Sequence, residues 1–445
     1  MEIILIKTLQ FFASLSLLVM VHEFGHYITA RIFKIRVEQF YIFFNPWFSL
    51  YKRKIGDTVY GIGWLPLGGY VSLAGMIDES IDKEQIDNMQ QPAQPWEFRA
   101  KPAWQRLIVM LAGVVMNVLA AMVIYTGVLY TWGESYIHND DVRYGYLFDE
   151  AAESVGFQDG DRIITINGNR VERINDIVMQ LLITDADADV EVLRGREVVS
   201  LNIALDDLVA MRESGEWSGI YNKVIVAPYL ISEVTSDAAR EAGLLEGDRI
   251  VAMNGVQTLD RREGDEILMA HKGTTIIADV EREGELLQLV LPINDEGKIG
   301  IMIEPLIIEP RTHYFGFWES IPAGVRYTGE QIASYWEQLK MIVNPDTKMY
   351  KELGGFIAIG NVFPSEWSWQ GFWNITALLS IMLAVMNLLP IPGLDGGHAL
   401  FTLWEIITRR KPSDKFLIVV QWIGMALLFA LLFYANGNDI LRFFL

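Results

Sequence analysis

The chain contains no cysteine among its 445 residues. This absence excludes disulfide bridges, cysteine-based zinc fingers, cysteine nucleophiles and iron–sulfur clusters. A metal ion bound by this chain must therefore be held by histidine, carboxylate or carbonyl groups. The absence of cysteine gives no information about the redox compartment.

Positive charge is also scarce, and its shortage is confined to the middle of the chain. The formal net charge is −20, and residues 133–312 contain 36 Asp and Glu against 16 Lys and Arg. The rest of the chain therefore sums to zero. Nucleic-acid binding requires a basic surface, so we expect no nucleic-acid partner. An acidic section between two apolar ends is instead typical of a solvated insertion between membrane segments.

Long hydrophobic runs dominate the two ends. Hydrophobic residues make up 51 % of the sequence and aromatic residues 12 %, and the mean hydropathy is +0.23. A transmembrane helix needs about 20 apolar residues. Four segments meet this requirement, at about Ile3–Ala30, Trp104–Tyr130, Trp373–Leu389 and Phe416–Tyr434. The sequence therefore predicts a polytopic α-helical membrane protein with four transmembrane helices.

The first hydrophobic segment has an alternative interpretation as a cleaved signal peptide. We favour a retained span, because the segment lacks a strongly basic start and a small-residue cleavage site. Lys and Arg gather after span one, before span two and between spans three and four. Basic loops of this kind stay on the cytoplasmic side. Both termini and the acidic middle section are therefore expected on the extracytoplasmic side.

The middle section contains an internal repeat. Two alanines, a glycine, a Gly-Asp-Arg-Ile sequence and an Asn-Gly pair recur with one offset of 87 residues, at 151–152, 156, 160–163 and 167–168 and again at 238–239, 243, 247–250 and 254–255. Each copy predicts a short helix, a turn, an apolar strand and an Asn-Gly hairpin turn. Such a duplication indicates two β-rich domains. These residues resemble circularly permuted PDZ domains of bacterial membrane proteases; the alternative is a generic small β domain.

The segment after span one has strand character. Residues 58–64 and 70–73 flank the Pro-Leu-Gly-Gly sequence at 66–69. We expect the two runs to pair as a β-hairpin that is apolar enough to enter the membrane beside span one. A polar loop is expected from Asp78 to Ala100, and a helix with apolar and polar faces from Phe315 to Met341.

The sequence His22-Glu23-Phe24-Gly25-His26 lies inside the first hydrophobic segment. On a helix His22 and His26 are one turn apart on the same face, so both imidazoles can hold one cation. A catalytic zinc ion takes such ligands, a third ligand and an open position for water. The ion lowers the pKa of that water from about 15.7 toward 7. Glu23 is close enough to take the proton of the water and deliver it to the leaving amide nitrogen.

The position of these ionisable residues inside a predicted transmembrane helix strengthens the interpretation as a metal site. An ionisable side chain inside the bilayer costs roughly 2.5–3.5 kcal/mol on insertion scales, so a cluster of them requires a compensating partner. A divalent metal ion and a water-filled pocket would compensate this cost. The alternative is that His22 and His26 only form hydrogen bonds between helices.

A third ligand is expected from residues 387–398, Asn-Leu-Leu-Pro-Ile-Pro-Gly-Leu-Asp-Gly-Gly-His. The prolines and glycines break the helix, and a broken helix at membrane depth must be buried in protein or line a cavity. Asp395 lies in this break and is our first candidate. His398 is the alternative ligand, and otherwise a supporting histidine. Asn387 either donates to the substrate carbonyl and the developing oxyanion or only forms a hydrogen bond at the helix end.

Together the two motifs resemble the site-2 protease family of intramembrane zinc metalloproteases. The residues that carry the resemblance are, in order, His22-Glu23-Phe24-Gly25-His26, Gly68-Gly69-Tyr70, Leu353-Gly354-Gly355 and Asn387-x-x-Pro390-x-Pro392-x-Leu394-Asp395-Gly396. The tandem PDZ-like domains between spans two and three narrow the resemblance to the regulator of sigma-E protease type. The family commonly has glycine three residues before the asparagine, where this chain has Ala384. This departure concerns helix packing rather than the chemistry.

The resemblance implies a role for each matching residue. The implied Zn²⁺ ligands are His22, His26 and Asp395, with Glu23 as the general base. The implied substrate-binding residues are Asn387, Pro390 and Pro392 beside the metal, together with Gly68, Gly69 and Tyr70 in a membrane-reentrant β-loop that pairs with an extended substrate. Pairing of the substrate with a strand edge agrees with the requirements of peptide cleavage. A helix hides its peptide bonds, so cleavage requires an extended peptide, and strand addition stabilises an extended peptide.

We accordingly expect eight segments along the chain. They are transmembrane helix 1 with the His motif (1–33), a cytoplasmic loop with the reentrant β-hairpin (34–103), transmembrane helix 2 (104–132), two PDZ-like domains (133–228 and 229–308), an extracytoplasmic amphipathic region (309–371), transmembrane helix 3 with the Leu-Asp-Gly motif (372–408), and transmembrane helix 4 with the C-terminus (409–445).

The expected function is that of an endopeptidase in the bacterial inner membrane. It would cleave transmembrane segments of single-pass proteins, such as anti-sigma-factor-like regulators and remnant signal peptides, in regulated intramembrane proteolysis. The PDZ-like pair would either exclude uncut substrates by size or bind newly made C-termini. One rival function is a non-catalytic membrane scaffold, which leaves Glu23 unexplained. Another is a metal transporter, which requires a polar path through the other spans.

Overall fold

The structure is a computed structural model that describes residues 2–66, 68–76, 92–182, 184, 186–214, 225–306, 308–345 and 349–444. It divides into two compact units, of which the first comprises residues 1–134, 314–343 and 349–445 and the second residues 135–313 and 344–348. Most of the loop expected from Asp78 to Ala100 lies outside the described residues, and its end, Phe98–Ala100, forms the 3₁₀ turn η1.

Four helices among the described residues are long and apolar enough to cross a bilayer. They are α1 (Glu2–Ile32), α3 (Ala103–Trp132), α12 (Trp369–Leu388) and the Val419–Leu441 part of α14 (Asp414–Phe444). At about 1.5 Å per residue, even the shortest of them matches the hydrocarbon core of about 30 Å. The expectation of four helices long and apolar enough to span a bilayer is confirmed for the described residues.

Helix α3 is the central element of the first unit. It packs against α1, α12, α13 (Asp395–Thr408) and α10 (Phe317–Val343), so the helix expected near Phe315–Met341 is confirmed. Val109, Gly113, Asn117 and Ala121 are all buried in α3. A spacing of four residues places these side chains on one face of the helix. This face is the one that reaches the candidate site.

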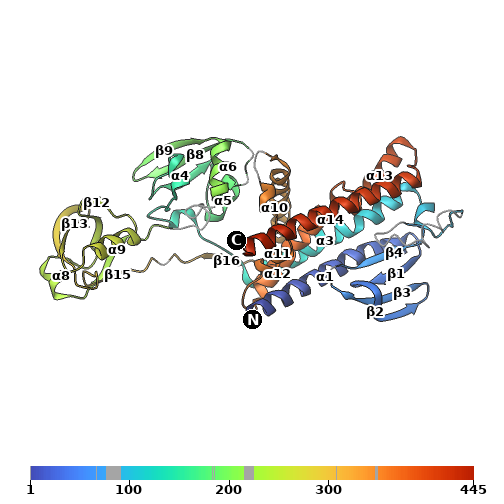
Figure 1. Ribbon diagram of the computed structural model, residues 1–445, viewed down its shortest axis with the longest axis horizontal. Helices are drawn as coiled ribbons and strands as arrows, with labels where there is room; N and C mark the ends of the chain where they lie inside the picture. Colours follow the sequence, from blue (N-terminus) through green and yellow to red (C-terminus); the bar gives the residue numbers. More distant parts are fainter. Residues whose placement is uncertain are drawn as a thin grey trace. The chain divides into compact units, whose positions relative to one another are not determined.

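The residues after α1 form a four-stranded sheet. The strands β1 (Val37–Tyr41), β2 (Phe44–Ile55), β3 (Thr58–Leu65) and β4 (Tyr70–Leu73) lie in the order β2-β3-β1-β4. β2 and β3 form an antiparallel hairpin, and β1 runs parallel to β3 and antiparallel to β4. Figure 1 shows the sheet beside the C-terminal part of α1, which contacts β1 and β4.

The expected hairpin between residues 58–64 and 70–73 is therefore wrong. β1 lies between these strands, and the Tyr41 ring stacks on the Tyr70 ring with a centroid distance of 5.3 Å and an interplanar angle of 1°. The chain after β3 thus crosses two strand spacings, about 10 Å, before it enters β4. The antiparallel hairpin of this sheet is β2–β3, and β4 is an edge strand of the described sheet.

The third hydrophobic segment ends in a break, as expected. α12 ends at Leu388 and α13 begins at Asp395, and Gly393 between them has a φ of 99°. α14 approaches this break closely, because a Cβ on Gly424 would lie 1.6 Å from the carbonyl oxygen of Pro392. The stretch before α12 forms the 3₁₀ turn η4 (Met349–Glu352) and α11 (Phe356–Val362), and α11 contacts α14.

The second unit contains two β domains with the same element order. The first contains α4 (Glu150–Ser154), β6 (Arg162–Ile166), β7 (Asn169–Arg170), α5 (Ile174–Leu182), β8 (Ala188–Arg194) and β9 (Glu197–Ile203); the second contains α8 (Asp237–Glu241), β11 (Arg249–Met253), β12 (Val256–Gln257), α9 (Arg261–Ala270), β13 (Thr275–Arg282) and β14 (Glu285–Pro292). The strand order is β7-β6-β8-β9 in the first domain. It is β14-β13-β11-β10-β15 in the second, where β10 (Tyr229–Val234) and β15 (Ile301–Ile303) extend the sheet and β12 pairs with β11. Each domain has its own hydrophobic core.

The remaining elements of this unit extend or connect the two domains. They are β5 (Glu134–Tyr136), which pairs with β16 (Arg311–His313), the 3₁₀ turn η2 (Asn139–Asp141), α6 (Leu205–Ser214), β10 (Tyr229–Val234) and β15 (Ile301–Ile303).

The repeated residues have the same structural role in both domains. Asn167 and Asn254 have φ angles of 52° and 51°, and each is followed by a glycine with positive φ. This geometry belongs to a two-residue hairpin turn, so the expected Asn-Gly turns are confirmed.

The buried aspartates of the two repeats are also bound in the same way. Asp161 accepts hydrogen bonds from Nε and Nη2 of Arg194 at 2.8 and 2.7 Å. Asp248 accepts hydrogen bonds from Nε and Nη2 of Arg282, both at 2.7 Å. Both aspartates are fully buried. Two-point arginine–carboxylate contacts of this kind fix the geometry as well as the charge.

Candidate metal centre

The His-Glu-x-x-His sequence lies on the continuous helix α1. Because His22 and His26 are four residues apart, their imidazoles project from the same face. The two Nε2 atoms are 3.2 Å apart, and each residue is only 7 % exposed. The helix thus presents two nitrogen ligands side by side within the first span.

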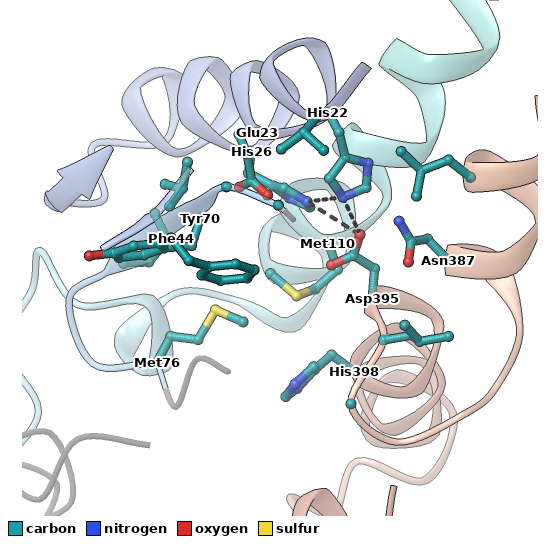
Figure 2. A pocket seen from close by; sticks show the side chains of 18 of the residues that line it. His22, Glu23, His26, Phe44, Tyr70, Met76, Met110, Asn387, Asp395 and His398 are labelled. Carbon is teal, nitrogen blue, oxygen red and sulfur yellow. Dashed lines mark hydrogen bonds and ion pairs between the residues drawn. The ribbon is translucent and has the colours of Figure 1, made fainter. Parts of the chain in front are cut away.

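Asp395 meets these imidazoles from the opposite end of the chain. It is the first residue of α13, and its Oδ2 atom lies 3.0 Å from Nε2 of His22 and 3.3 Å from Nε2 of His26. Figure 2 shows the carboxylate pointing toward both rings. Apart from the two imidazoles, this buried oxygen has no hydrogen-bond partner among the described residues. It is the third potential ligand, as the three ligand atoms lie within 4.8 Å of one another.

The spacing of these atoms can be compared with that of a zinc site. Ligand atoms at about 2.0–2.1 Å from a tetrahedral zinc ion are separated by roughly 3.3 Å. The three observed separations are 3.0, 3.2 and 3.3 Å. Two imidazoles and one carboxylate also form a known donor set for catalytic zinc, in which a fourth position is left for water or substrate. The residues therefore fit a zinc ion.

Glu23 lies on the same helix turn as the ligands. Its carboxylate accepts a hydrogen bond from the backbone N–H of Val71 in β4. The backbone of Gly69 also lies close, because a Cβ there would meet Cγ of Glu23 at 3.6 Å and the Tyr41 carbonyl oxygen at 2.6 Å. The carboxylate of Glu23 is thus held between the ligand face of α1 and the edge of the sheet.

Two glycines bring α3 against α1 at the level of the imidazoles. A Cβ on Gly25 would lie 2.5 Å from the carbonyl oxygen of Ala112, and a Cβ on Gly113 would lie 2.5 Å from Nε2 of His26. At this separation the Val109 carbonyl reaches Nδ1 of His26 at 2.8 Å. Because a carbonyl can only accept, Nδ1 carries the hydrogen and Nε2 keeps the lone pair that a metal requires.

Neither Gly113 nor the Val109 carbonyl was expected from the sequence. A backbone carbonyl carries no sequence signal. Gly113 acts where α3 packs against α1, and these two helices are far apart in the sequence. The signal that was present is the polar residue Asn117, four positions after the small residue Gly113, in the apolar middle of the second span. A polar side chain at membrane depth is a candidate for a functional role.

The ligand cluster opens into a cavity of about 760 Å³. Apolar side chains form much of its wall, including Leu15, Val19, Leu65, Met76, Met110 and Leu383. Among the residues expected to bind substrate, Gly68, Gly69, Tyr70 and Asn387 line the cavity. Pro390 and Pro392 do not line it and lie in the break between α12 and α13.

The alternative ligand His398 is not brought to the cluster. It lines the cavity, but its side chain is hydrogen-bonded to Gln421 of α14 and Figure 2 shows it apart from the three converging side chains. Asn387, at the end of α12, lies beside Asp395 in the same view.

A buried ion pair holds α13 on α3. Nη2 of Arg106 donates to Oε1 of Glu405 at 2.6 Å, and the two side chains are 9 % and 18 % exposed. Because Asp395 and Glu405 lie on the same helix, this pair fixes the helix that carries the carboxylate. The candidate centre therefore depends on three separate segments, namely α1, α3 and α13.

Comparisons with known proteins agree with this arrangement. The family described as Peptidase family M50 matches residues 10–431. A Vibrio cholerae protein named "Putative zinc metalloprotease" is 30 % identical over 464 residues, covering 99 % of both chains. The regulator of sigma E protease of Haemophilus influenzae is 29 % identical over 452 residues, covering 97 % of this chain and 98 % of its own. The chain therefore belongs to peptidase family M50, the site-2 protease family, and is a membrane-embedded zinc metalloprotease.

Proposed function

We propose that this protease cleaves the transmembrane segments of single-pass membrane proteins in regulated intramembrane proteolysis. The observation that carries this proposal is the convergence of His22, His26 and Asp395 beside Glu23, within a bundle whose helices can cross a bilayer. Anti-sigma-factor-like regulators and remnant signal peptides are the proposed substrates. The similarity to a protein named regulator of sigma E protease supports this class.

The proposed ligands of Zn²⁺ are Nε2 of His22, Nε2 of His26 and the carboxylate of Asp395. When bound, the ion supplies a Lewis acid that acidifies water and polarises a carbonyl group. Glu23 is the proposed general base, since its carboxylate lies at the cavity and is oriented by the N–H of Val71. It takes the proton of the attacking water and passes it to the amide nitrogen, so that the C–N bond breaks and an amine leaves.

Asn387 is the proposed donor to the substrate. Its side chain lines the cavity beside Asp395. An amide N–H aimed at the scissile carbonyl would stabilise the negative charge that develops on its oxygen. Asn387 would also fix the orientation of the bound peptide.

The edge of β4 is the proposed site for the extended substrate. β4 pairs with β1 on one side, and the N–H of Val71 faces Glu23 on the other. A peptide that adds to this edge would therefore run past the general base. Strand addition also supplies main-chain hydrogen bonds that an unwound transmembrane segment has lost. Gly68, Gly69 and Tyr70 lead into this edge and line the same cavity.

The β2–β3 hairpin is proposed to enter the membrane. Trp47 is 91 % exposed and Phe48 is 56 % exposed, and both rings stack on Trp64. Exposed aromatic rings of this kind are typical of the membrane interface. The basic residues at 52–54 farther along β2 would then lie in the headgroup region.

We place the protein in the bacterial inner membrane, with both termini and the two β domains on the extracytoplasmic side. The β domains are proposed to be PDZ-like, because two copies of one sheet-and-helix unit repeat the same turns and the same buried Asp–Arg pair. They would act as a size filter or bind newly made C-termini. A substrate with a bulky outer domain distinguishes the two: only the filter predicts faster cleavage when both domains are deleted.

The absence of cysteine allows a clean test of this orientation. Single cysteines introduced at Glu153 in the first β domain and at Arg53 in β2 would be the only thiols in the protein. A membrane-impermeant maleimide applied to intact spheroplasts is expected to label Glu153→Cys and to leave Arg53→Cys unlabelled until the membrane is permeabilised. The opposite pattern would reverse the proposed topology.

The cleavage reaction is tested with purified full-length protein in detergent and a tagged single-pass substrate. Glu23→Gln is expected to abolish cleavage while keeping the zinc content of the wild type. Glu153→Gln, an exposed residue on α4, is the matched control and should cleave normally. Equal cleavage by Glu23→Gln and the wild type would contradict the proposed role of Glu23.

A further inference from the structure

We infer that Asn117 is a positioning residue that holds the His22 imidazole by its Nδ1 atom, so that Nε2 faces the metal. Asn117 lies on α3 and is fully buried, and its Nδ2 atom is 3.1 Å from Nδ1 of His22. This inference rests on the metal site of the proposed function. It adds a residue that is not one of the proposed ligands and that does not line the cavity.

The position of Asn117 follows from the way α3 faces α1. Val109, Gly113 and Asn117 follow one another at intervals of one helical turn on the buried face of α3. Val109 supports His26 through its carbonyl, Gly113 leaves room for both rings, and Asn117 reaches His22. The two imidazoles are thus each held at Nδ1 by the same helix.

The chemistry of the two supports differs. The Val109 carbonyl can only accept a hydrogen bond, so it selects one tautomer of His26. The amide of Asn117 has a donor and an acceptor, and it can support either tautomer of His22. With Nδ2 toward the ring, the amide donates to Nδ1, and the hydrogen of His22 lies on Nε2 facing Asp395.

A cation on Nε2 of His22 requires the other tautomer, with the hydrogen on Nδ1 and an acceptor opposite it. The acceptor is present in the same side chain. The Oδ1 atom of Asn117 is buried and has no hydrogen-bond partner among the described residues. Rotation of the amide by half a turn exchanges Nδ2 and Oδ1, and the unsatisfied oxygen then accepts from Nδ1 of His22.

The backbone of Asn117 is held independently of its side chain. Oγ of Ser380 in α12 donates to the Asn117 carbonyl oxygen at 2.8 Å. This contact provides a matched control, because Ser380→Ala removes a buried hydrogen bond to the same residue without changing the amide that faces His22.

The experiment measures metal binding by the full-length protein in detergent. Zn²⁺ affinity is measured by competition with a chelator, and Co²⁺ binding by its visible absorption, which reports the geometry of the ligands. Loss of a group that orients a metal-bound histidine typically weakens binding 10- to 100-fold. Asn117→Leu, similar in size but without the amide, is expected to weaken Zn²⁺ by about this factor and to alter the Co²⁺ spectrum. Ser380→Ala is expected to keep both at wild-type values.

Asn117→Asp provides a second variant of nearly identical shape. It keeps an acceptor for the N–H of His22 and loses the donor. It is therefore expected to bind Zn²⁺ at least as tightly as the wild type, and it decides the question if Asn117→Leu does not fold. Three outcomes would each overturn the inference. Asn117→Leu could bind Zn²⁺ as tightly as the wild type, or Asn117→Leu and Ser380→Ala could lose the same Zn²⁺ affinity. The third is weakened Zn²⁺ binding in Asn117→Asp. A wild-type protein that binds no Zn²⁺ would instead contradict the proposed metal site.

Discussion

Gly113 of α3 and His26 of α1 are in direct contact, and a single methyl group on Gly113 would lie 2.5 Å from Nε2 of the imidazole. Gly113→Ala should therefore push the rings of both histidines away from Asp395. A misplacement of about 1 Å in an active site can cost about 100-fold in rate. We expect a loss of this order in cleavage, together with weaker Zn²⁺ binding in the chelator competition assay.

Gly127→Ala is the matched control for this prediction. Gly127 lies on the same helix, and a Cβ there would meet no atom within 4 Å. This substitution should keep full activity and stabilise α3 by up to about 1 kcal/mol. If Gly113→Ala were as active as Gly127→Ala, α3 would not set the position of the imidazoles.

The contact between α14 and the helix break gives a second prediction. A Cβ on Gly424 would lie 1.6 Å from the Pro392 carbonyl oxygen, so Gly424→Ala must displace either α14 or the segment that leads to Asp395. Overpacking of this kind typically costs about 1–3 kcal/mol. We expect a lower thermal unfolding temperature in detergent and slower cleavage. Gly437→Ala on the same helix meets no atom within 4 Å and should change neither; similar behaviour of the two variants would refute the prediction.

The buried Asp–Arg pairs give a third prediction, for the two β domains. Arg194→Met removes the arginine from the fully buried carboxylate of Asp161, which keeps only a backbone N–H donor, and Arg282→Met does the same to Asp248. Breaking a buried pair by removing one partner costs on the order of 3 kcal/mol. Both variants should unfold at lower urea concentration when the full-length protein is probed by proteolysis. Lys298→Met is the control, because its pair with Glu296 is exposed and worth under about 1 kcal/mol.

A pH-dependent contribution is expected from Asp260, the residue that caps α9. Burial alone would raise its pKa, but hydrogen bonds from the N–H of Ala227 and from Arg262, together with the Arg262 charge, hold the pKa below its usual value. In the unfolded chain the pKa is about 3.9. These contacts therefore stabilise the domain fully above about pH 4, and the contribution is lost as the pH falls through the folded pKa.

Asp260→Asn keeps the shape of the cap and removes the charge. The variant should be less stable than the wild type near neutral pH by about 1–3 kcal/mol, and the difference should shrink on acidification below pH 4. Hydrogen exchange of the α9 amides, corrected for the intrinsic pH dependence of exchange, measures the difference. A gap that stays constant from neutral to acidic pH would show that the charge of Asp260 does not stabilise α9.

Much of the membrane part could be predicted because its signals are local. The spans are continuous apolar runs, and the break before Asp395 follows from prolines and glycines that cannot continue a helix. The two β domains could be separated because one set of turn residues recurs at a fixed offset. In each of these cases neighbouring residues determine the structure.

The features that could not be predicted all depend on contacts between distant segments. The insertion of β1 between β3 and β4 places Tyr41 on Tyr70, and neither run of residues shows this alone. The approach of α3 to α1 depends on Gly25 and Gly113, which are far apart in the chain. The amide of Asn117 faces His22 for the same reason.

The proposed ligands are supplied by the first and the last parts of the chain, and this has a consequence for biosynthesis. A polypeptide still emerging from the ribosome would carry both imidazoles and Glu23 in the membrane but would lack the carboxylate of Asp395. Hydrolytic competence would then arise only after the final helices have inserted and α13 has docked on α3. Unfinished copies would therefore be unable to hydrolyse neighbouring membrane proteins.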